Sequence, residues 1–123
     1  MQVKDVMRPQ TIAVDYNRSC SLAAKMMAQN QISSILVRKG EEIVGILTEA
    51  DIVRRVVAGG EDPIKVMVDT VMSFPIYTID EEGSIDQARK VMAENQTRHL
   101  VVTRKGKPVG MFSARDLINI STP

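Results

Sequence analysis

The sequence repeats itself once, and this repeat constrains the fold more than any other feature of the chain. Residues 3–55 align with residues 68–120 without a gap, and 15 of the 53 aligned positions are identical. Chance similarity between two apolar segments rarely keeps one register over such a length. Two copies with a period of 65 residues are too few and too long for a solenoid. We therefore expect a pseudo-symmetric pair, with a first motif at residues 1–57, a linker at 58–67 and a second motif at 68–123.

Both copies show the same order of predicted elements. Each begins with a short β-branched segment that indicates a strand, and continues with a helix whose apolar residues recur at i, i+3, i+4 and i+7. In the second copy, Ser84 and Gln87 form the pattern of a capping box at the start of this helix. The remaining elements are a hairpin and a last helix, with strands at 11–14, 35–38 and 43–47, and at 76–79, 100–104 and 109–112.

The order β-α-β-β-α determines the expected fold class. A unit of about 55 residues has one sheet face to bury and too little core to do so alone. We therefore expect an α+β protein in which two pseudo-symmetric β-α-β-β-α motifs pack sheet to sheet. Between them, Gly59-Gly60 ends the last helix of the first motif, and Asp62-Pro63 has the pattern of a short helix start.

Composition argues against several classes of function. Two Tyr, two Phe and no Trp provide no aromatic platform for single-stranded nucleic acid, and a net charge of +1 provides no basic surface for duplex DNA. A single cysteine, Cys20, and a single histidine, His99, exclude an intrachain disulfide and argue against a metal site or a Ser-His-Asp triad. Apolar runs of about five residues are too short to span a membrane, and the N-terminus lacks a signal peptide, so we expect a cytoplasmic protein.

One pattern occurs at equivalent positions of both copies: Gly, two apolar residues, Ser or Thr, two variable residues and Asp, at 45–51 and 110–116. A hydroxyl followed three residues later by an acid is the pattern of a capping box, which is a purely structural role. The same geometry also suits a nucleotide. Backbone N–H groups and a hydroxyl at a helix start can bind phosphate, and a carboxylate one turn later can accept hydrogen bonds from a ribose diol.

These motifs make the sequence resemble a tandem pair of CBS domains, the cystathionine-β-synthase regulatory modules. The resemblance covers nearly the whole chain and depends on the order and duplication of its parts. Those parts are the opening Val-Lys-Asp-Val-Met and Val-Asp-Thr-Val-Met, the strand before Asp15 or Asp80, the helix ending Met-Ala-Gln-Asn-Gln or Met-Ala-Glu-Asn-Gln, the strand at 35–37 or 100–102, and the closing Gly-x-x-Ser/Thr-x-x-Asp.

The resemblance implies two clefts between the sheets of the two motifs, which in this family bind AMP, ADP, ATP or S-adenosylmethionine. Asp51 and Asp116 would bind ribose hydroxyls, and Thr48 and Ser113 would lie by ribose or phosphate. The other implied contacts are to adenine, from Thr11, Ile12, Ala13, Tyr77 and Thr78, and to phosphate, from Ser33, Ser34, Arg98 and His99. Because an arginine holds phosphate better than a hydroxyl does, we expect one strong cleft and one weak or empty cleft.

The function implied is that of a stand-alone regulatory module for energy sensing or adenosyl-ligand sensing. We expect no catalytic activity and no catalytic cofactor; the output would be a conformational change that the ligand biases. The resemblance also implies a homodimer, formed through the apolar faces of the last helices and the second halves of the first helices, and a protein partner that the sequence does not identify. Two alternatives stay open: a structural dimerisation module with empty clefts, and a nucleic-acid accessory binder.

Overall fold

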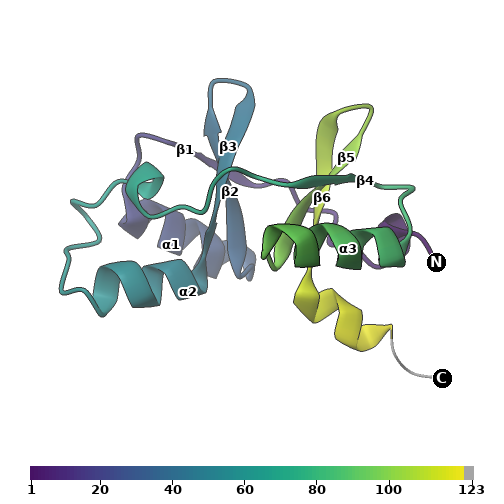
Figure 1. The fold of residues 1–123 in the computed structure, drawn as a ribbon. Coiled ribbons are helices and arrows are strands. Elements are labelled where there is room, and N and C mark those ends of the chain that lie inside the picture. Colours follow the sequence, from purple (N-terminus) through teal and green to yellow (C-terminus); the bar gives the residue numbers. More distant parts are fainter. Residues whose placement is uncertain (121–123) are drawn as a thin grey trace. The chain divides into compact units, whose positions relative to one another are not determined.

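The computed structural model describes residues 1–120, which fold into two compact units (Figure 1). The middle unit comprises Ile12–Ile76. The terminal unit comprises Met1–Thr11 together with the chain from Tyr77 onward. The two units have the same topology, as the repeat predicts.

The middle unit is a three-stranded sheet in the order β1-β2-β3, with helices before and after the hairpin. Strand β1 runs parallel to β2, and β2 runs antiparallel to β3. The elements are β1 (Ala13–Asp15), α1 (Cys20–Asn30), β2 (Ser34–Lys39), β3 (Glu42–Thr48), α2 (Glu49–Asp51), the π-helical η2 (Ile52–Val57) and the 3-10 turn η3 (Val68–Thr70).

The terminal unit repeats this arrangement in the order β4-β5-β6, again with one parallel and one antiparallel pairing. Its purple N-terminal segment lies beside α3 in Figure 1. The elements are the 3-10 turn η1 (Val3–Asp5), β4 (Thr78–Asp80), α3 (Ile85–Asn95), β5 (His99–Arg104), β6 (Lys107–Ser113) and the 3-10 helix η4 (Ala114–Asn119).

The α+β class and the two β-α-β-β-α motifs are therefore confirmed, with two differences in the helices. The last helix is not regular: it changes from α to π after Asp51 in the middle unit, and it is a 3-10 helix in the terminal unit. The short helix expected at Asp62-Pro63 is a single turn. There the Asp62 carboxylate accepts a hydrogen bond from the backbone N–H of Ile64 at 3.0 Å, as a capping residue does, and the Asp62 carbonyl accepts bonds from Lys65 and Val66 N–H at 2.9 and 3.1 Å.

The first helix of each unit begins after a serine cap and ends at a glutamine. Ser84 and Gln87 form the predicted capping box, with N–H···O distances of 2.8 and 3.0 Å. At the other end, Gln31 and Gln96 have φ values of 54° and 51°, so each terminates its helix in the left-handed conformation. The repeated Asn-Gln at these positions is therefore a helix stop.

In the middle unit, the core lies between α1 and one face of the sheet. Cys20, Ala23 and Met27 of α1 are buried against Ile35 and Val37 of β2. Burial raises the pKa of the Cys20 thiol, which keeps it neutral. The apolar face of α1, including Met27, thus forms part of the core, and Cys20 serves as a small buried hydrophobe.

The opening segment of each sequence repeat packs into the unit built mainly from the other repeat. Val3 is fully buried in the core of the terminal unit, and Val68 in the core of the middle unit. Arg8 exchanges backbone hydrogen bonds of 2.9 and 2.8 Å with Met111 of β6, and Ser73 exchanges bonds of 2.8 and 3.1 Å with Ile46 of β3. The compact units therefore cross the repeat boundaries, which the period of 65 residues alone does not indicate.

An ion pair in the terminal unit gives a pH-dependent prediction. Arg104 donates two hydrogen bonds to the mostly buried Glu81, one of them at 3.0 Å, and this pairing lowers the pKa of the Glu81 carboxyl below its ordinary 4.5. A lowered folded-state pKa stabilises the fold above pH 4.5, and the contribution is lost as the pH falls through the folded-state value.

We therefore expect Glu81→Gln to lower the melting temperature at pH 7, and the difference from wild type to shrink between pH 5 and pH 3. Thermal unfolding followed by circular dichroism at several pH values measures this. Glu82→Gln, a change at the exposed neighbouring residue, is the control. A difference in melting temperature that stays constant over this range contradicts the assignment.

Candidate ligand-binding sites

In each unit, the predicted site residues lie along one edge of the sheet, namely the edge formed by the ends of its strands. The first two strands begin at this edge because they are parallel, and the third strand ends there because it is antiparallel. Ser34 lies opposite Thr48 in the middle unit, and His99 lies opposite Ser113 in the terminal unit. The two hydroxyl residues of the motif thus lie directly beside the residues predicted to contact phosphate.

Four of the five residues predicted to contact adenine, Ile12, Ala13, Tyr77 and Thr78, lie at the same edge, one strand further across. The backbone carbonyl of Ile12 accepts a hydrogen bond from Leu36 N–H at 3.1 Å, and that of Tyr77 accepts one from Val101 N–H at 2.9 Å. Ala13 and Thr78 begin β1 and β4. Thr11 is exposed and is the last residue of the N-terminal segment of the terminal unit.

Thr48 and Asp51 of the middle unit form a reciprocal capping box. Thr48 N–H donates to Asp51 Oδ2 at 2.9 Å, and Asp51 N–H donates to Thr48 Oγ1 at 3.1 Å. The structural role of this pattern is therefore present. Asp51 is only partly buried, and its other oxygen, Oδ1, makes no hydrogen bond or ion pair with the described residues. One carboxylate oxygen of Asp51 remains available to a ligand hydroxyl.

Asp116 of the terminal unit has the same position but different surroundings. Its Oδ2 accepts hydrogen bonds from Ser113 N–H at 2.8 Å and from Ser113 Oγ–H at 3.3 Å. Its Oδ1 lies 3.6 Å from Arg8 Nε, and the residue is only 6% exposed. Both oxygens of Asp116 therefore have partners, whereas Asp51 keeps one oxygen available.

Ser33 and Arg98 flank these carboxylates at equivalent places. The carbonyl of Ser33 accepts a hydrogen bond from Glu49 N–H at 3.0 Å, and that of Arg98 accepts one from Ala114 N–H at 2.9 Å. These bonds join the start of the last helix to the chain just before the middle strand. Ser33 is partly buried and the Arg98 side chain is exposed, so the neutral and basic character predicted for the two sites lies beside the motif in each unit.

The first residue of the motif has a role that the sequence does not suggest. A Cβ atom on Gly110 would lie 2.6 Å from the carbonyl oxygen of Arg8, and one on Gly45 would overlap the Met72 side chain. Each glycine therefore lets the opening segment of the other repeat reach the third strand.

Arg8 was also not predicted as a site residue. The signal that could have found it is its alignment with the uncharged Ser73 next to an otherwise matching Val-Met.

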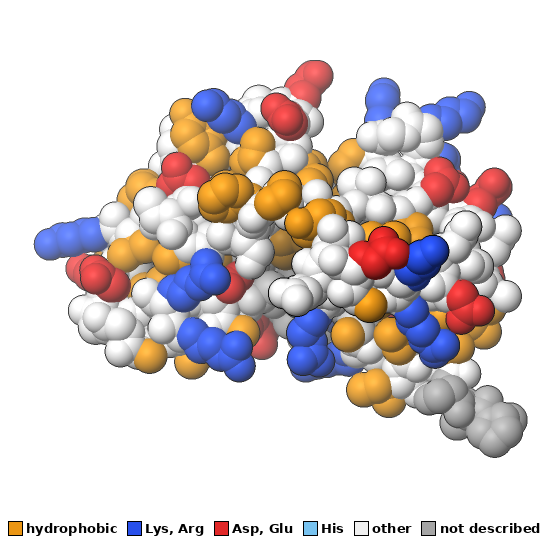
Figure 2. All heavy atoms as spheres, in the orientation of Figure 1, with side chains coloured by type: hydrophobic (Ala, Val, Ile, Leu, Met, Phe, Trp, Pro, Cys, Tyr) orange, Lys and Arg blue, Asp and Glu red, His pale blue; other side chains and the backbone are white. Residues whose placement is uncertain are grey.

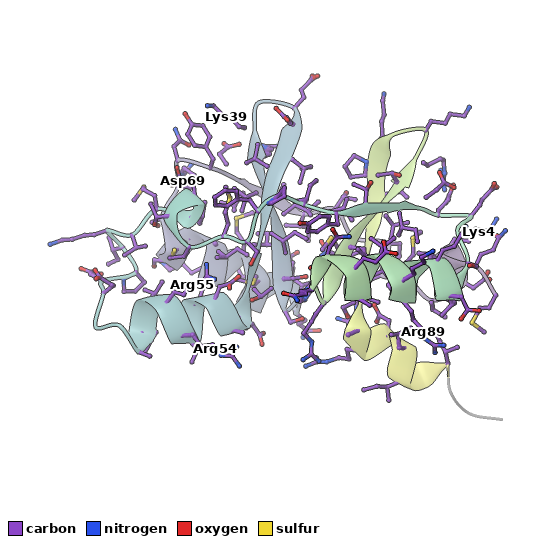
Figure 3. All side chains as sticks on the ribbon, in the orientation of Figure 1. Lys4, Lys39, Arg54, Arg55, Asp69 and Arg89 are labelled. Carbon is purple, nitrogen blue, oxygen red and sulfur yellow. The ribbon has the colours of Figure 1, made fainter. Side chains whose placement is uncertain are left out.

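The helix after β3 has a charged and an apolar surface. Figure 2 shows Lys and Arg side chains over this helix, where Figure 3 labels Arg54 and Arg55. Arg54 is exposed, whereas Arg55 donates a hydrogen bond from Nη1 to the carbonyl of Val71 at 2.9 Å. Arg55 thus joins the helix that follows the motif to the segment that reaches Gly45.

Within residues 1–120, no group of three or more His, Cys, Asp or Glu side chains is placed to hold a metal ion. None of the helices in this part of the chain has the length and apolar character that a membrane span requires.

Comparison with known proteins confirms the resemblance seen in the sequence. The family model described as "CBS domain" matches residues 3–58 and 68–122. The chain is 32% identical over 115 residues to the CBS domain-containing protein YhcV of Bacillus subtilis, covering 94% of this chain and 81% of YhcV. It is also 32% identical over 100 residues to the uncharacterized protein MK0525 of Methanopyrus kandleri, covering 80% of this chain. The chain spans 51% of the length of MK0525.

Solved structures show the same architecture. An uncharacterized conserved protein from Pyrococcus horikoshii superposes with a TM-score of 0.84 at 26% identity, covering 99% of this chain and 92% of that one. A structure of Hypoxic Response Protein I with two coordinated zinc ions superposes with a TM-score of 0.77 at 27% identity, covering all of both chains. The chain belongs to the CBS-domain family and carries two CBS domains, modules that are generally regulatory and bind ligands.

Proposed function

We propose that this protein is a non-catalytic regulatory module that binds an adenosyl ligand (AMP, ADP, ATP or S-adenosylmethionine) through the two motif carboxylates. The observation that carries the proposal is the meeting of three segments at one sheet edge in both units. There a hydroxyl, a carboxylate and the residues before the middle strand lie together. A purely structural capping box does not require this second set of polar residues.

The chemistry of the edge suits a nucleoside. The unoccupied Oδ1 of Asp51 can accept a hydrogen bond from a ribose hydroxyl, and a bond to a charged acceptor contributes about 1.5–3 kcal/mol. Ile12 and Tyr77, which are partly buried just before the first strands, can provide apolar side-chain contacts for a purine. A ligand held in this way changes the protein only as far as it binds one conformation better than another.

A ligand screen tests the proposal. We expect at least one of AMP, ADP, ATP, S-adenosylmethionine and NADH to raise the melting temperature, by an amount equivalent to about 2.7 kcal/mol at a hundredfold excess over Kd. Isothermal titration should then show that Asp51→Asn combined with Asp116→Asn abolishes binding. Asp86→Asn, a change to an exposed carboxylate on α3, should not.

Two results would count against the proposal. If none of these ligands binds in either assay, the chain is not an adenosyl-ligand sensor. Salt-dependent binding to an oligonucleotide, without nucleotide binding, would favour nucleic-acid recognition instead.

The apolar surface of η2 supports self-association as a second function. Val53 and Val57 are four residues apart on this helix and are 59% and 63% exposed. We expect a dimer at micromolar concentration, and expect the double change Val53→Lys and Val57→Lys to shift it to monomer in sedimentation velocity experiments while leaving nucleotide affinity intact. Ile64→Lys, a change at an apolar residue that is 69% exposed outside the helices, is the control. A wild-type monomer at 100 times this concentration would exclude the proposal.

A further inference from the structure

The two candidate sites differ at one position that the repeat makes directly comparable. Arg8 and Ser73 occupy equivalent places, since each exchanges a pair of backbone hydrogen bonds with the third strand of its unit. The Arg8 guanidinium lies 3.6 Å from Asp116 Oδ1. Asp51, the equivalent carboxylate of the middle unit, has no cation partner among residues 1–120.

We propose that Arg8 makes the terminal-unit site selective for anionic ligands, so that a nucleoside phosphate binds there and an uncharged nucleoside does not compete well. The inference depends on the proposed function and assigns a charge class to each of its two sites. By the same comparison, the middle-unit site, with Ser73 in place of Arg8, accepts an uncharged nucleoside.

The physical reason lies in how the two oxygens of Asp116 are used. One oxygen accepts hydrogen bonds from Ser113, and the other is paired with Arg8, so a ribose diol must compete with Arg8 for the carboxylate. The Arg8 side chain is 46% exposed and can therefore change its conformation. A phosphate on the same ligand gives the guanidinium a new anionic partner as it leaves Asp116. An uncharged nucleoside gives it none and must compete with Arg8 for the carboxylate.

Exchanging the residues at the equivalent positions 8 and 73 tests directly whether Arg8 determines the charge preference of the site. In an Asp51→Asn background, which leaves the terminal-unit site, Arg8→Ser introduces the residue that the middle unit uses at this place. By isothermal titration, we expect the Kd of AMP to rise about tenfold, as loss of one bond between charged groups predicts, and the Kd of adenosine to stay constant or fall. Arg89→Ser removes an exposed arginine of α3 and controls for net charge. The reciprocal Ser73→Arg, in an Asp116→Asn background, should make the middle-unit site prefer AMP over adenosine.

The opposite signs separate selectivity from a merely structural role of Arg8, which would weaken both ligands by the same factor. Equal changes for AMP and adenosine, or no change for either, would overturn the inference. Failure of the Asp51→Asn protein to bind AMP would overturn it as well, while adenosyl binding by the wild type would still sustain the proposed function. If the wild type binds neither ligand, the proposed function fails and this inference fails with it.

Discussion

Gly110→Ala is expected to lower the free energy of unfolding by about 1–3 kcal/mol, the range for overpacking a well-filled site. The new Cβ would lie 2.6 Å from the carbonyl oxygen of Arg8, which is backbone and is held in place by two hydrogen bonds to Met111. Relief of this overlap requires the N-terminal segment to move away from β6. Urea unfolding followed by circular dichroism measures the loss.

Gly45→Ala is the matched comparison, because this glycine has the same place in the other motif. There the new Cβ would mainly overlap the Met72 side chain, and the nearest backbone atom, Ser73 O, would be 3.1 Å away. A methionine side chain has three rotatable bonds and can adopt another rotamer. We therefore expect a smaller loss for Gly45→Ala than for Gly110→Ala. Equal losses, or a larger loss at Gly45, would contradict the view that the backbone of the opening segment is the rigid partner.

The sequence predicted the elements of each unit well because the relevant signals are local. Apolar spacing located α1 and α3, and the Ser84–Gln87 pair located a helix start that the structure confirms to the residue. In the sequence, turn-forming residues marked the boundary between β2 and β3 and the boundary between β5 and β6. The helix types after Thr48 and Ser113 could not be predicted, since π and 3-10 hydrogen bonding in these short helices depends on how each helix packs rather than on its residue types.

The packing of the opening segments could not be derived from the repeat. Val-x-x-Val-Met has the same apolar residues in both copies, so Val3 and Val68 suit either core equally well. The backbone bonds of Arg8 to Met111 and of Ser73 to Ile46 decide between them, and no residue pattern records such bonds. Arg8 became a site candidate only through this packing, whereas Thr48, Asp51, Ser113 and Asp116 were identified by a motif that lies within one turn of chain.

The strongest effect on ligand binding is expected from the two motif carboxylates, and it should be unequal. We expect Asp51→Asn to weaken adenosine binding by about tenfold or more, because the residue presents an unpaired oxygen and a bond to a charged acceptor contributes about 1.5–3 kcal/mol. We expect Asp116→Asn to change adenosine affinity less than about threefold, since both of its oxygens already have partners. Isothermal titration of each single variant with adenosine measures both effects, with Asp86→Asn as the control for loss of a carboxylate. Equal losses in the two variants would show that the pairing of Asp116 with Arg8 does not distinguish the sites, and that the difference in charge between the two sheet edges has no consequence for binding.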